Sequence, residues 1–402
     1  LSGVRVLDLS RVLAGPWASQ LLADYGADVI KIERPGSGDD TRLWGPPWLA
    51  DNLGTATAES AYFLSANRNK KSVTADLSQP GGQALVKDLA RNSDILIENF
   101  RVGTMARYGL DAESLQKLNP RLIYCSISAY GQTGSRHALP GYDAMIQAEA
   151  GLMSITGASD ADGGRPQKVG VAIADIMTGM YAVTAVLAAL HATHRDGRGQ
   201  SIDLSLYQTQ VAWLANQAQN YLMTGLSPVR LGTAHPNLVP YQTFETTDGE
   251  VMLAVGNDRQ FVACMQCLDL GDRAITQHFS TNDARVRNRA ELIAVMSDRM
   301  RQKSSAHWLA ELAAAGVPAG RINDLRTVFS DAYAAEAGLV QQVPHALAKR
   351  VPTVCNPVHF SSTPVEYRSA APTLGQHTEE VLRDGLKYSA AEIEALRQCG
   401  AI

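Results

Sequence analysis

The chain has 402 residues, of which 45% are hydrophobic and 19% charged, and its formal net charge is −4. This length exceeds one ordinary hydrophobic core, so a globular protein of two domains is expected. The small acidic excess argues against a general nucleic-acid-binding surface, which requires clustered basic charge.

The first third of the chain alternates strand-like and helical patterns. Helical patterns follow Pro16 and cover residues 83–91. Strands that alternate with helices pair in parallel, with helices on both faces of the sheet. The prediction is an α/β fold with a Rossmann-like open parallel sheet. The four predicted strands cover residues 4–9, 28–33, 94–98 and 122–127.

Residues 169–190 form a long apolar stretch (VGVAIADIMTGMYAVTAVLAAL) that is predicted to be a buried central helix. Its aspartate, threonines and glycines, and the lack of flanking aromatic or basic clusters, argue against a membrane span. From about residue 225 the pattern changes to a hairpin with an Asp248-Gly249 turn, followed by helices. We therefore expect three parts: residues 1–224 in a large α/β domain, 225–320 in a small α+β domain, and 321–402 returning to the large domain.

Asp175 is the only ionisable residue of the 169–190 stretch apart from Tyr181. A carboxylate taken out of water is costly unless it has a partner. The residues alone leave three roles open for Asp175: a helix cap, a buried ion pair, or a group held ready for chemistry.

Several motifs that would indicate other chemistry are absent. The chain contains no G-x-G-x-x-G, no G-x-x-x-x-G-K-[ST], no G-x-S-x-G and no H-E-x-x-H. Cys264 and Cys267 have C-x-x-C spacing but lie on a helical pattern with no second ligand pair, so core packing is expected and no metal is implied. The five scattered cysteines suit reduced thiols. No signal peptide is visible, so a cytoplasmic location is expected, or the mitochondrial matrix of a eukaryote after removal of a transit peptide.

Basic residues near strand ends form the other candidate site. Residues 67–72 (NRNKKS) are either a solvated loop or, with Arg11, Arg34 and Arg107, a set of cations for a ligand with several phosphates. The loop 232–237 (GTAHPN) is either a surface turn or a binding edge.

Over nearly its whole length the chain carries an ordered series of short runs that resembles the class III CoA-transferase family. These runs are VLDL…AGP, GADVIKIERPG, NKKS, ENF, LNPRLIY, GYD, AD and LGQHT. This resemblance implies that Asp175 is a nucleophile that forms covalent acyl and CoA intermediates. It implies coenzyme A or acyl-CoA as a substrate, with no tightly bound cofactor, and a small carboxylic acid as the second substrate. The implied CoA contacts are Arg11, Ala14, Arg34, Asp76, Asn99, Phe100, Arg107, Tyr142 and Asp143, with Lys70 and Lys71 as additional phosphate contacts.

Within the family the chain is most similar to the succinate–glutarate (hydroxymethylglutarate) branch, through GDDTR, WGPP, GTAH and VPYQ. Leu13 stands where formyl-CoA transferases carry a glutamine, and their four-glycine loop is absent. Both departures favour a longer dicarboxylate over oxalate or formate. We expect His235, and also Arg42, to meet the remote carboxylate of that acid.

Two other functions share the fold. A 2-methylacyl-CoA racemase or epimerase would use a histidine opposite the aspartate, but Tyr142 occupies that position here. The third hypothesis is a non-catalytic CoA-binding protein. The resemblance also implies an interlocked homodimer, and no nucleic acid or membrane partner is expected.

Overall fold

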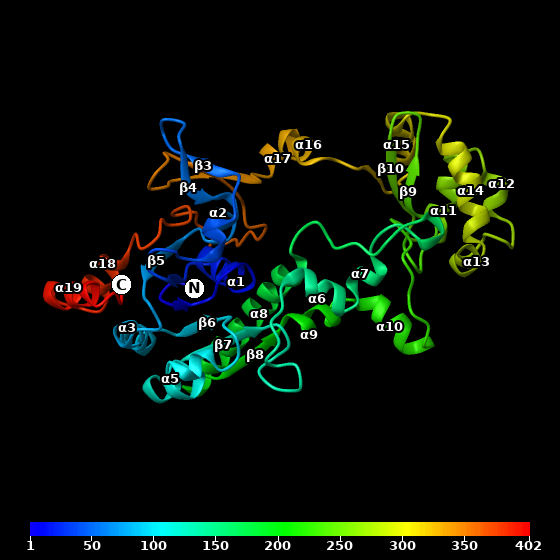
Figure 1. Cartoon of the computed structure of the whole chain (residues 1–402). Coiled ribbons are helices and arrows are strands. Elements are labelled where there is room, and N and C mark those ends of the chain that lie inside the picture. The colour runs from blue at the N-terminus through cyan, green and yellow to red at the C-terminus, as the bar shows by residue number, and fades with distance from the viewer. The chain divides into compact units, whose positions relative to one another are not determined.

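The computed structural model describes residues 1–402 and divides the chain into two compact units (Figure 1). Unit 1 comprises Leu1–Leu152, Val169–Leu222 and Ala335–Ile402, and unit 2 comprises Met153–Lys168 and Met223–Ala334.

These boundaries differ from the expected ones in two places. Residues 153–168 lie in unit 2, because Gly157 O accepts from Gly232 N at 3.0 Å and Arg230 Nε donates to Ala158 O at 3.2 Å. The chain returns to unit 1 at Ala335 and not at residue 321, because the strand Ala319–Arg321 still pairs within unit 2.

Unit 1 is built on a six-stranded parallel sheet with the order β5-β2-β1-β6-β7-β8, which confirms the predicted α/β class. The strand β1 lies near the middle, so the loop that follows it opens at the centre of the carboxyl edge, where open parallel sheets bind ligands. The strands are β1 (Arg5–Asp8), β2 (Asp28–Glu33), β5 (Lys70–Thr74), β6 (Ile95–Glu98), β7 (Ile123–Ser128) and β8 (Ser201–Ser205).

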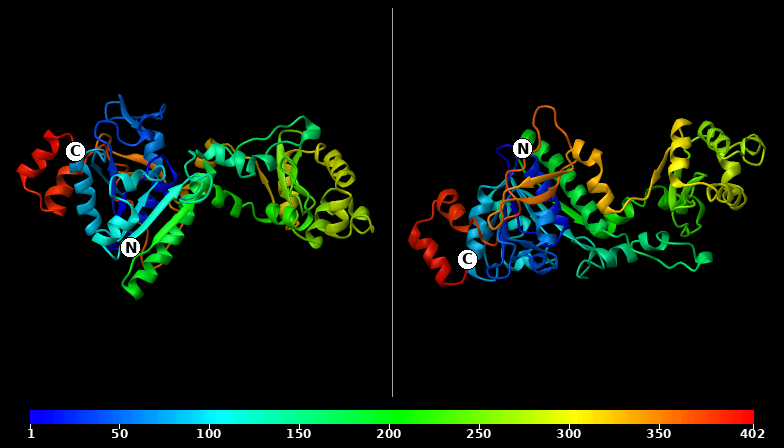
Figure 2. Two further views of the ribbon diagram at one scale, coloured as in Figure 1. Left: turned by 60° about the horizontal axis from the view of Figure 1, so that its bottom comes forward. Right: turned by 90° about the horizontal axis from the view of Figure 1, so that it is seen from above.

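Alternation along these strands sends apolar side chains to both faces. Ile95 and Ile97 pack against α1 (Ala14–Asp24) and α8 (Ile173–Asp196). Leu96 points the other way, toward α3 (Pro80–Arg91), α5 (Ala112–Leu118) and the C-terminal α19 (Ala390–Gln398). Figures 1 and 2 show the C-terminal helices, in red, beside the first segments of the chain. The sheet is therefore covered on both faces, as a parallel sheet requires.

The helix α8 is the predicted central helix, and its contact with α1 is very close. A Cβ atom built on Gly179 would lie 2.7 Å from the Ala14 carbonyl oxygen, so only glycine fits there. By length and composition α8 could also cross a membrane, but that test is passed by core helices too. Ala182, Val186 and Ala189 of α8 are buried in the core of unit 1.

The basic segment 67–72 is not the solvated loop that was one of its two interpretations. From Lys70 it forms the edge strand β5, which pairs with β2 from Val29↔Lys70 to Glu33↔Thr74. The near-C-terminal segment then lies along the other side of β5, where Ser72 O accepts from His377 N at 2.9 Å and Thr74 N donates to Thr378 Oγ1 at 3.0 Å. This coverage satisfies part of the exposed strand edge.

Shorter elements complete unit 1. Two antiparallel pairs, β3 with β4 and β12 with β13, lie outside the main sheet. Several helices of unit 1 begin with a side-chain cap, such as Asp111 before α5 and Ser389 before α19. The elements are η1 (Asp40–Leu43), β3 (Trp48–Ala50), β4 (Ala56–Ser60), α2 (Ala61–Ala66), α4 (Thr104–Arg107), α6 (Asp143–Glu149), α9 (Leu206–Ala212), α10 (Ala215–Thr224), β12 (Val340–Val343), β13 (Val351–Val354), α18 (Thr378–Glu380) and η3 (Val381–Gly385).

Unit 2 contains the predicted hairpin, β9 (Tyr241–Glu245) with β10 (Glu250–Ala254), in an antiparallel sheet of order β11-β10-β9. Its core gathers Phe244, Phe261 and Trp308, and includes the buried Cys264, as predicted for a packing role. The other elements are α7 (Leu152–Ile155, from the end of unit 1), η2 (Asp160–Asp162), α11 (Asp258–Cys267), α12 (Gly271–Ala274), α13 (Asn282–Arg287), α14 (Arg289–Met300), α15 (Ser305–Ala314), β11 (Ala319–Arg321), α16 (Leu325–Ser330) and α17 (Ala332–Glu336).

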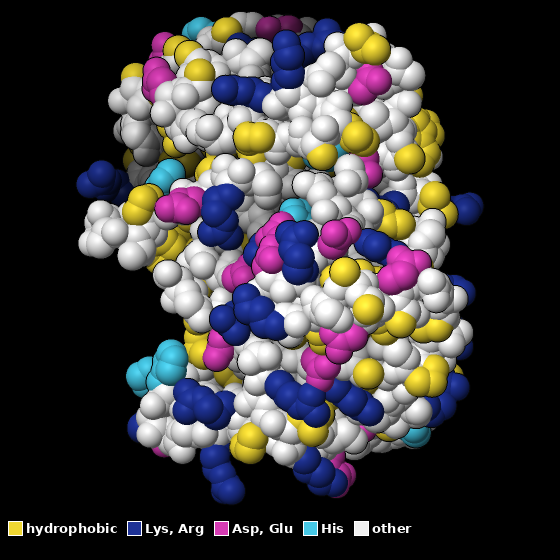
Figure 3. Space-filling model, turned by 90° about the vertical axis from the view of Figure 1, so that its left-hand side faces the viewer, with side chains coloured by type: hydrophobic (Ala, Val, Ile, Leu, Met, Phe, Trp, Pro, Cys, Tyr) yellow, Lys and Arg dark blue, Asp and Glu magenta, His cyan; other side chains and the backbone are white.

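The face that carries α18 and α19 has mixed charge. Figure 3 shows Lys and Arg side chains interleaved with Asp and Glu across it. Arg383 and Arg397 both pair there with Glu379, at 3.6 Å and 2.9 Å. This face therefore has no continuous basic field of the kind that binds nucleic acid.

Candidate active site

Two cavities open at the carboxyl edge of the sheet in unit 1. The first has a volume of about 310 Å³ and lies beyond β1, β2 and β5. The second has a volume of about 190 Å³ and contains Asp175. Arg11, Asp40 and Phe100 line both cavities, so the two cavities are adjacent.

The shared wall is held by reciprocal bonds between the loops after β1 and β6. Arg11 N donates to Asn99 Oδ1 at 2.8 Å, and Asn99 Nδ2 donates to Arg11 O at 2.7 Å. The Arg11 guanidinium lies 5.3 Å from the centre of the Phe100 ring and 3.2 Å from an Asp40 carboxylate oxygen. An aromatic face, a cation and peptide groups are therefore exposed together.

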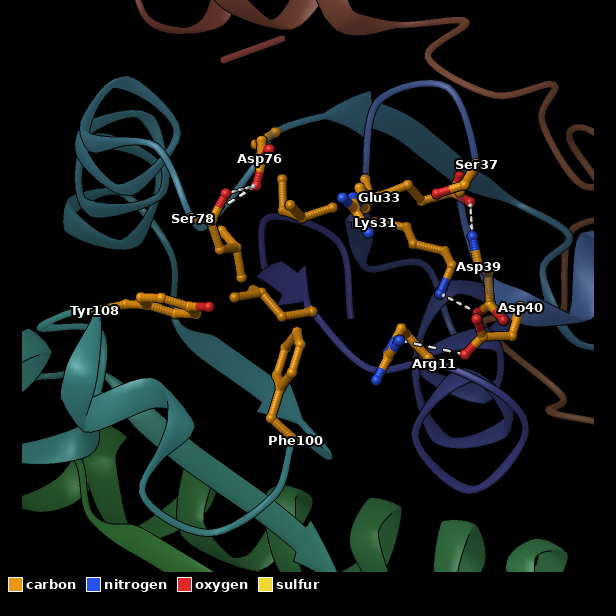
Figure 4. Close-up of a pocket in the computed structure, with 16 residues that line it drawn as sticks. Arg11, Lys31, Glu33, Ser37, Asp39, Asp40, Asp76, Ser78, Phe100 and Tyr108 are labelled. Carbon is orange, nitrogen blue, oxygen red and sulfur yellow. Dashed lines mark hydrogen bonds and ion pairs between the residues drawn. The ribbon is translucent and has the colours of Figure 1, made fainter. Parts of the chain in front are cut away.

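Figure 4 shows Phe100 and Tyr108 on one side of the first cavity and Arg11 with Asp40 on the other. Arg34 is exposed and its charge helps to lower the pKa of Asp76, after the hydrogen bonds that Asp76 accepts from Ser78. Flat aromatic faces suit a purine base, and the exposed guanidinium groups of Arg11 and Arg34 suit phosphate oxygens.

Asp175 lies in the first turn of α8 and is only 8% exposed. Neither structural role proposed for its carboxylate holds, because it caps no helix and has no cationic partner. Burial, and then the nearby charge of Asp143, raise its pKa to about 7. Of the three roles, only that of a group held ready for chemistry remains open for this carboxylate.

Two residues of α6 fix the start of α8. Asp143 Oδ1 accepts from Ala174 N at 2.7 Å and from Asp175 N at 3.2 Å, so it caps α8 from another helix. Gln147 is fully buried and binds the preceding loop through Val169 N at 2.9 Å. The backbone of the reactive aspartate is thus held by side chains outside its own helix.

Tyr62, on α2, was not predicted from the sequence as a site residue. Burial, and then the charges of Asp175, Asp143 and Asp39, raise its pKa to about 12. A hydroxyl that stays protonated is a permanent hydrogen-bond donor. No local pattern around Tyr62 signals this role, because the contact depends on how α2 packs.

The structure brings together most of the predicted site. Arg107 lines neither cavity but lies with its guanidinium 5.9 Å from the ring of Tyr108, which does line the first. Asp143 contacts the backbone of Asp175, as described above. The predicted residues that line one or both cavities are Arg11, Ala14, Arg34, Asp76, Asn99, Phe100, Tyr142 and Asp175.

The prediction that Lys70 and Lys71 contact phosphate does not hold. Lys70 is 1% exposed and its ammonium group binds Asp8 at 3.2 Å, Asn67 Oδ1 at 2.7 Å and Pro16 O at 2.9 Å. Lys71 lines neither cavity and pairs with Glu380 at 3.6 Å. The sequence could not separate these roles, since alternate residues of a strand point to opposite faces.

Arg42 is also not the carboxylate ligand that was predicted. It is 5% exposed and forms two hydrogen bonds of 2.8 Å with Glu33 and one of 2.9 Å with Glu59. Its guanidinium plane lies 3.7 Å from the centre of the Phe63 ring. All three of its guanidinium nitrogens donate inside the fold, so Arg42 is a structural residue.

His235 lies in unit 2, where its Nδ1 atom accepts from Asn237 N at 3.0 Å and Leu238 N at 3.1 Å. Burial, and then the charge of Arg289, lower the pKa of its imidazole. The ring is therefore neutral at pH 7 and carries its proton on Nε2. That His235 meets the remote carboxylate of the acid stays a prediction, and a neutral ring would meet it as a hydrogen-bond donor.

Comparison with known proteins agrees with this geometry. Residues 1–378 match the model of CoA-transferase family III. A succinate–glutarate CoA-transferase of Agrobacterium fabrum is 46% identical over 384 residues, which cover 96% of this chain and 95% of that protein. A succinyl-CoA:glutarate CoA-transferase of Mus musculus is 43% identical over 402 residues, which cover 100% of this chain and 90% of that protein.

The solved structures include a CAIB/BAIF family protein from Brucella suis. It superimposes with a TM-score of 0.83 at 45% identity and covers 96% of this chain and 98% of its own. The chain therefore belongs to CoA-transferase family III and is an enzyme that transfers coenzyme A between acyl groups.

Proposed function

We propose that this enzyme transfers CoA from succinyl-CoA, or a related dicarboxylyl-CoA, to a free dicarboxylic acid such as glutarate. The single observation that carries the proposal is that the two cavities adjoin at Arg11, Asp40 and Phe100. A nucleotide in the first cavity directs the extended arm of CoA toward Asp175 in the second. Relatives that are 41–46% identical are named for this succinate and glutarate chemistry.

The chemistry assigned to Asp175 is nucleophilic catalysis in two matched halves. Its carboxylate oxygen attacks the thioester carbonyl carbon, the carbon–sulfur bond breaks, and a mixed anhydride and CoA thiolate form. The thiolate then attacks the aspartyl carbonyl carbon, which releases the donor acid and leaves an aspartyl-CoA thioester.

The second half reverses these steps with the acceptor acid. The acceptor carboxylate attacks the aspartyl thioester, CoA thiolate leaves, and a new mixed anhydride forms. The thiolate attacks the acceptor carbonyl carbon, which gives the product thioester and restores the Asp175 carboxylate. No net proton or electron is consumed, so the cycle requires neither a metal nor a redox cofactor.

The surroundings of Asp175 suit such intermediates. Anhydrides and activated thioesters hydrolyse in water, and Asp175 is almost completely buried at the end of an apolar helix. Tyr62, which remains protonated, supports the proposal as a donor to an oxygen that gains charge at the reacting carbonyl.

Trapping of the covalent intermediate tests this proposal. The enzyme is mixed with succinyl-CoA and hydroxylamine, and peptides that contain Asp175 are analysed by mass spectrometry. Conversion of Asp175 to a hydroxamate, dependent on succinyl-CoA, is expected. Turnover of succinyl-CoA and glutarate without modification at Asp175 would overturn the covalent role, and modification without transfer to glutarate would overturn the substrate assignment.

We also propose that the enzyme is a homodimer, with chains that interlock. Large apolar side chains on α10 and the residues that follow it are well exposed, including Leu222 at 73%, Met223 at 77% and Leu226 at 74%. Exposed apolar groups in such a run favour a protein partner. Light scattering at several concentrations tests the dimer, and a monomer at all of them would contradict it.

A further inference from the structure

A third cavity, of about 300 Å³, lies behind the loop that carries Asn99 and Phe100. Residues Phe100, Arg101 and Val102 line both this cavity and the cavity of Asp175. The loop is therefore a thin partition with space on two sides. Packing alone does not fix such a segment, so its position depends on specific bonds.

Glu98 supplies the bond from behind. It is the last residue of β6, is 4% exposed, and lines the third cavity. Its Oε2 atom accepts from Phe100 N at 2.8 Å, and the neighbouring Ser126 hydroxyl acts to lower the pKa of its carboxyl group. The strand register places Glu98 beside Ser126 and Ser126 beside Asp203, so the three form a polar row across β6, β7 and β8.

The effect of this bond extends to the shared wall of the active site. Phe100 N is held by Glu98, and the neighbouring Asn99 exchanges two hydrogen bonds with the Arg11 backbone. The Arg11 guanidinium in turn lies against the Phe100 ring. One buried carboxylate thus controls the placement of an aromatic ring and a cation that both face the two front cavities.

We propose that Glu98 is a positioning residue for acyl-CoA, which holds Phe100 and Arg11 in their binding arrangement from behind the site. This inference rests on the proposed binding of CoA at Phe100 and Arg11. Glu98 touches neither of the front cavities, and its influence on the ligand passes through the Asn99–Phe100 loop.

The charge state of Glu98 makes the role measurable. A carboxylate accepts a charge-assisted bond from Phe100 N and is favoured by the Ser126 hydroxyl, whereas a protonated carboxyl group has one oxygen converted to a donor. Burial, opposed by those two groups and reinforced by the charge of Asp203, raises the pKa of Glu98 to about 7. The loop is thus held more firmly above this pH than below it. The other titratable or charged groups around Glu98 are Arg101, Asp111, Glu113, Tyr124 and Cys125.

The test measures the dissociation constant of CoA by calorimetry at pH 6 and pH 8.5. Because the phosphate of CoA titrates near pH 6 in every variant, the informative quantity is the difference between variants. In each variant, the dissociation constant at pH 6 is divided by the dissociation constant at pH 8.5. We expect this ratio to be about three- to tenfold larger for wild type than for Glu98→Gln. At pH 8.5, Glu98→Gln should bind CoA about three- to tenfold more weakly than wild type, at an unchanged affinity for the free acceptor acid.

Two further variants complete the design. Glu113→Gln is the matched control, because Glu113 lines the same third cavity but is exposed and pairs with Lys117 at 2.7 Å. It should behave as wild type. Ser126→Ala removes a hydroxyl that favours the charged form of Glu98, so it should move the pH midpoint of CoA binding upward. This second variant tests the inference independently of the folding of Glu98→Gln.

The outcomes separate this inference from the proposed function. If Phe100→Ala leaves CoA binding unchanged, the proposed CoA site itself is wrong. If Phe100→Ala weakens binding but Glu98→Gln follows the wild-type pH profile, and Ser126→Ala does not shift it, only the role of Glu98 is overturned. A merely structural Glu98 would change thermal stability without changing the pH profile of CoA binding.

Discussion

Asp8 and Asp175 are both buried aspartates near the carboxyl edge of one sheet, yet their environments drive them to opposite states. Burial opposes ionisation of Asp8, but Lys70 and Lys31, with the hydroxyls of Ser10 and Ser19, hold its pKa at about 2. Asp175 has no cation, and burial together with Asp143 raises its pKa to about 7.

The comparison shows that neighbouring cations and hydrogen-bond donors, and not the degree of burial, decide whether a buried carboxylate is charged. Asp8 has cations and donors on several sides, so it is permanently charged and forms part of the structure. Asp175 is shielded from water but left without a counter-ion, which suits the nucleophilic role that we propose for it. Three changes test this contrast between Asp8 and Asp175, and a fourth tests backbone strain at Val12. They follow in order of decreasing effect.

Asp175→Asn should reduce CoA transfer by about a thousandfold or more, because the amide cannot act as the nucleophile. Transfer from succinyl-CoA to glutarate measures the loss. The stability contributed by a protonated Asp175 is fully present below pH 3.8 and is lost as the pH rises to about 7. The variant should therefore be at least as stable as wild type at pH 8. Asp196→Asn, at the exposed end of the same helix, is the control and should keep full activity.

Lys70→Met should lower the free energy of unfolding by about 3–5 kcal/mol, because it leaves the buried Asp8 charge without its nearest cation. Urea unfolding at pH 7 measures the effect. Lys71→Met is the matched control on the same strand, and its exposed pairs with Asp28 and Glu380 predict a change below about 1 kcal/mol. Equal losses in both variants would contradict the structural assignment of Lys70.

Asp143→Asn should lower the pH midpoint of kcat/KM from its wild-type value near 7. The amide removes the negative charge that raises the pKa of Asp175, while its Oδ1 atom still accepts from Ala174 N and Asp175 N. Because the nucleophile is the carboxylate, wild-type activity should rise with pH through about 7 and the variant should reach its plateau earlier. An unchanged or higher midpoint would show that Asp143 does not act on Asp175 through charge.

Val12→Gly should have the smallest effect and should stabilise the fold by up to about 1 kcal/mol. Val12 has φ = 70°, which is unfavourable for a β-branched residue, and its N–H donates to Asp39 Oδ1 at 3.2 Å. Thermal unfolding measures the change in stability, and a CoA-binding assay measures whether the substitution changes binding. A loss of stability would mean that the contacts of the valine side chain outweigh the backbone strain.

Periodicity predicted the parts of the fold that depend on local pattern. The strands β1, β2, β6 and β7, the long α8 and the β9–β10 hairpin all follow from apolar spacing and turn residues. It did not predict that β5 is a strand, because Lys70 and Lys71 are poor strand residues whose burial depends on the distant Asp8.

The cavity lining was predictable where the residues follow strand ends and belong to a recognisable run, as for Arg11, Asn99 and Phe100. Asp175 was predictable as the single acidic residue of the apolar stretch 169–190. The site was not predictable where a cation is neutralised inside the fold, as Arg42 is by Glu33 and Glu59. Charge in a sequence does not reveal whether a side chain faces a ligand or a partner. Tyr62 and Glu98 were missed for the same reason, since their roles depend on tertiary contacts.

The glycine at position 179 has a mechanical consequence. It lies one helical turn beyond Asp175, where a single added methyl group would collide with the Ala14 carbonyl oxygen. Ala14 also lines the cavity of Asp175, so the same contact fixes both the wall and the nucleophile that faces it. The missing side chain at residue 179 thus sets how closely α8 approaches Ala14, and with it the distance of Asp175 from that wall of the cavity.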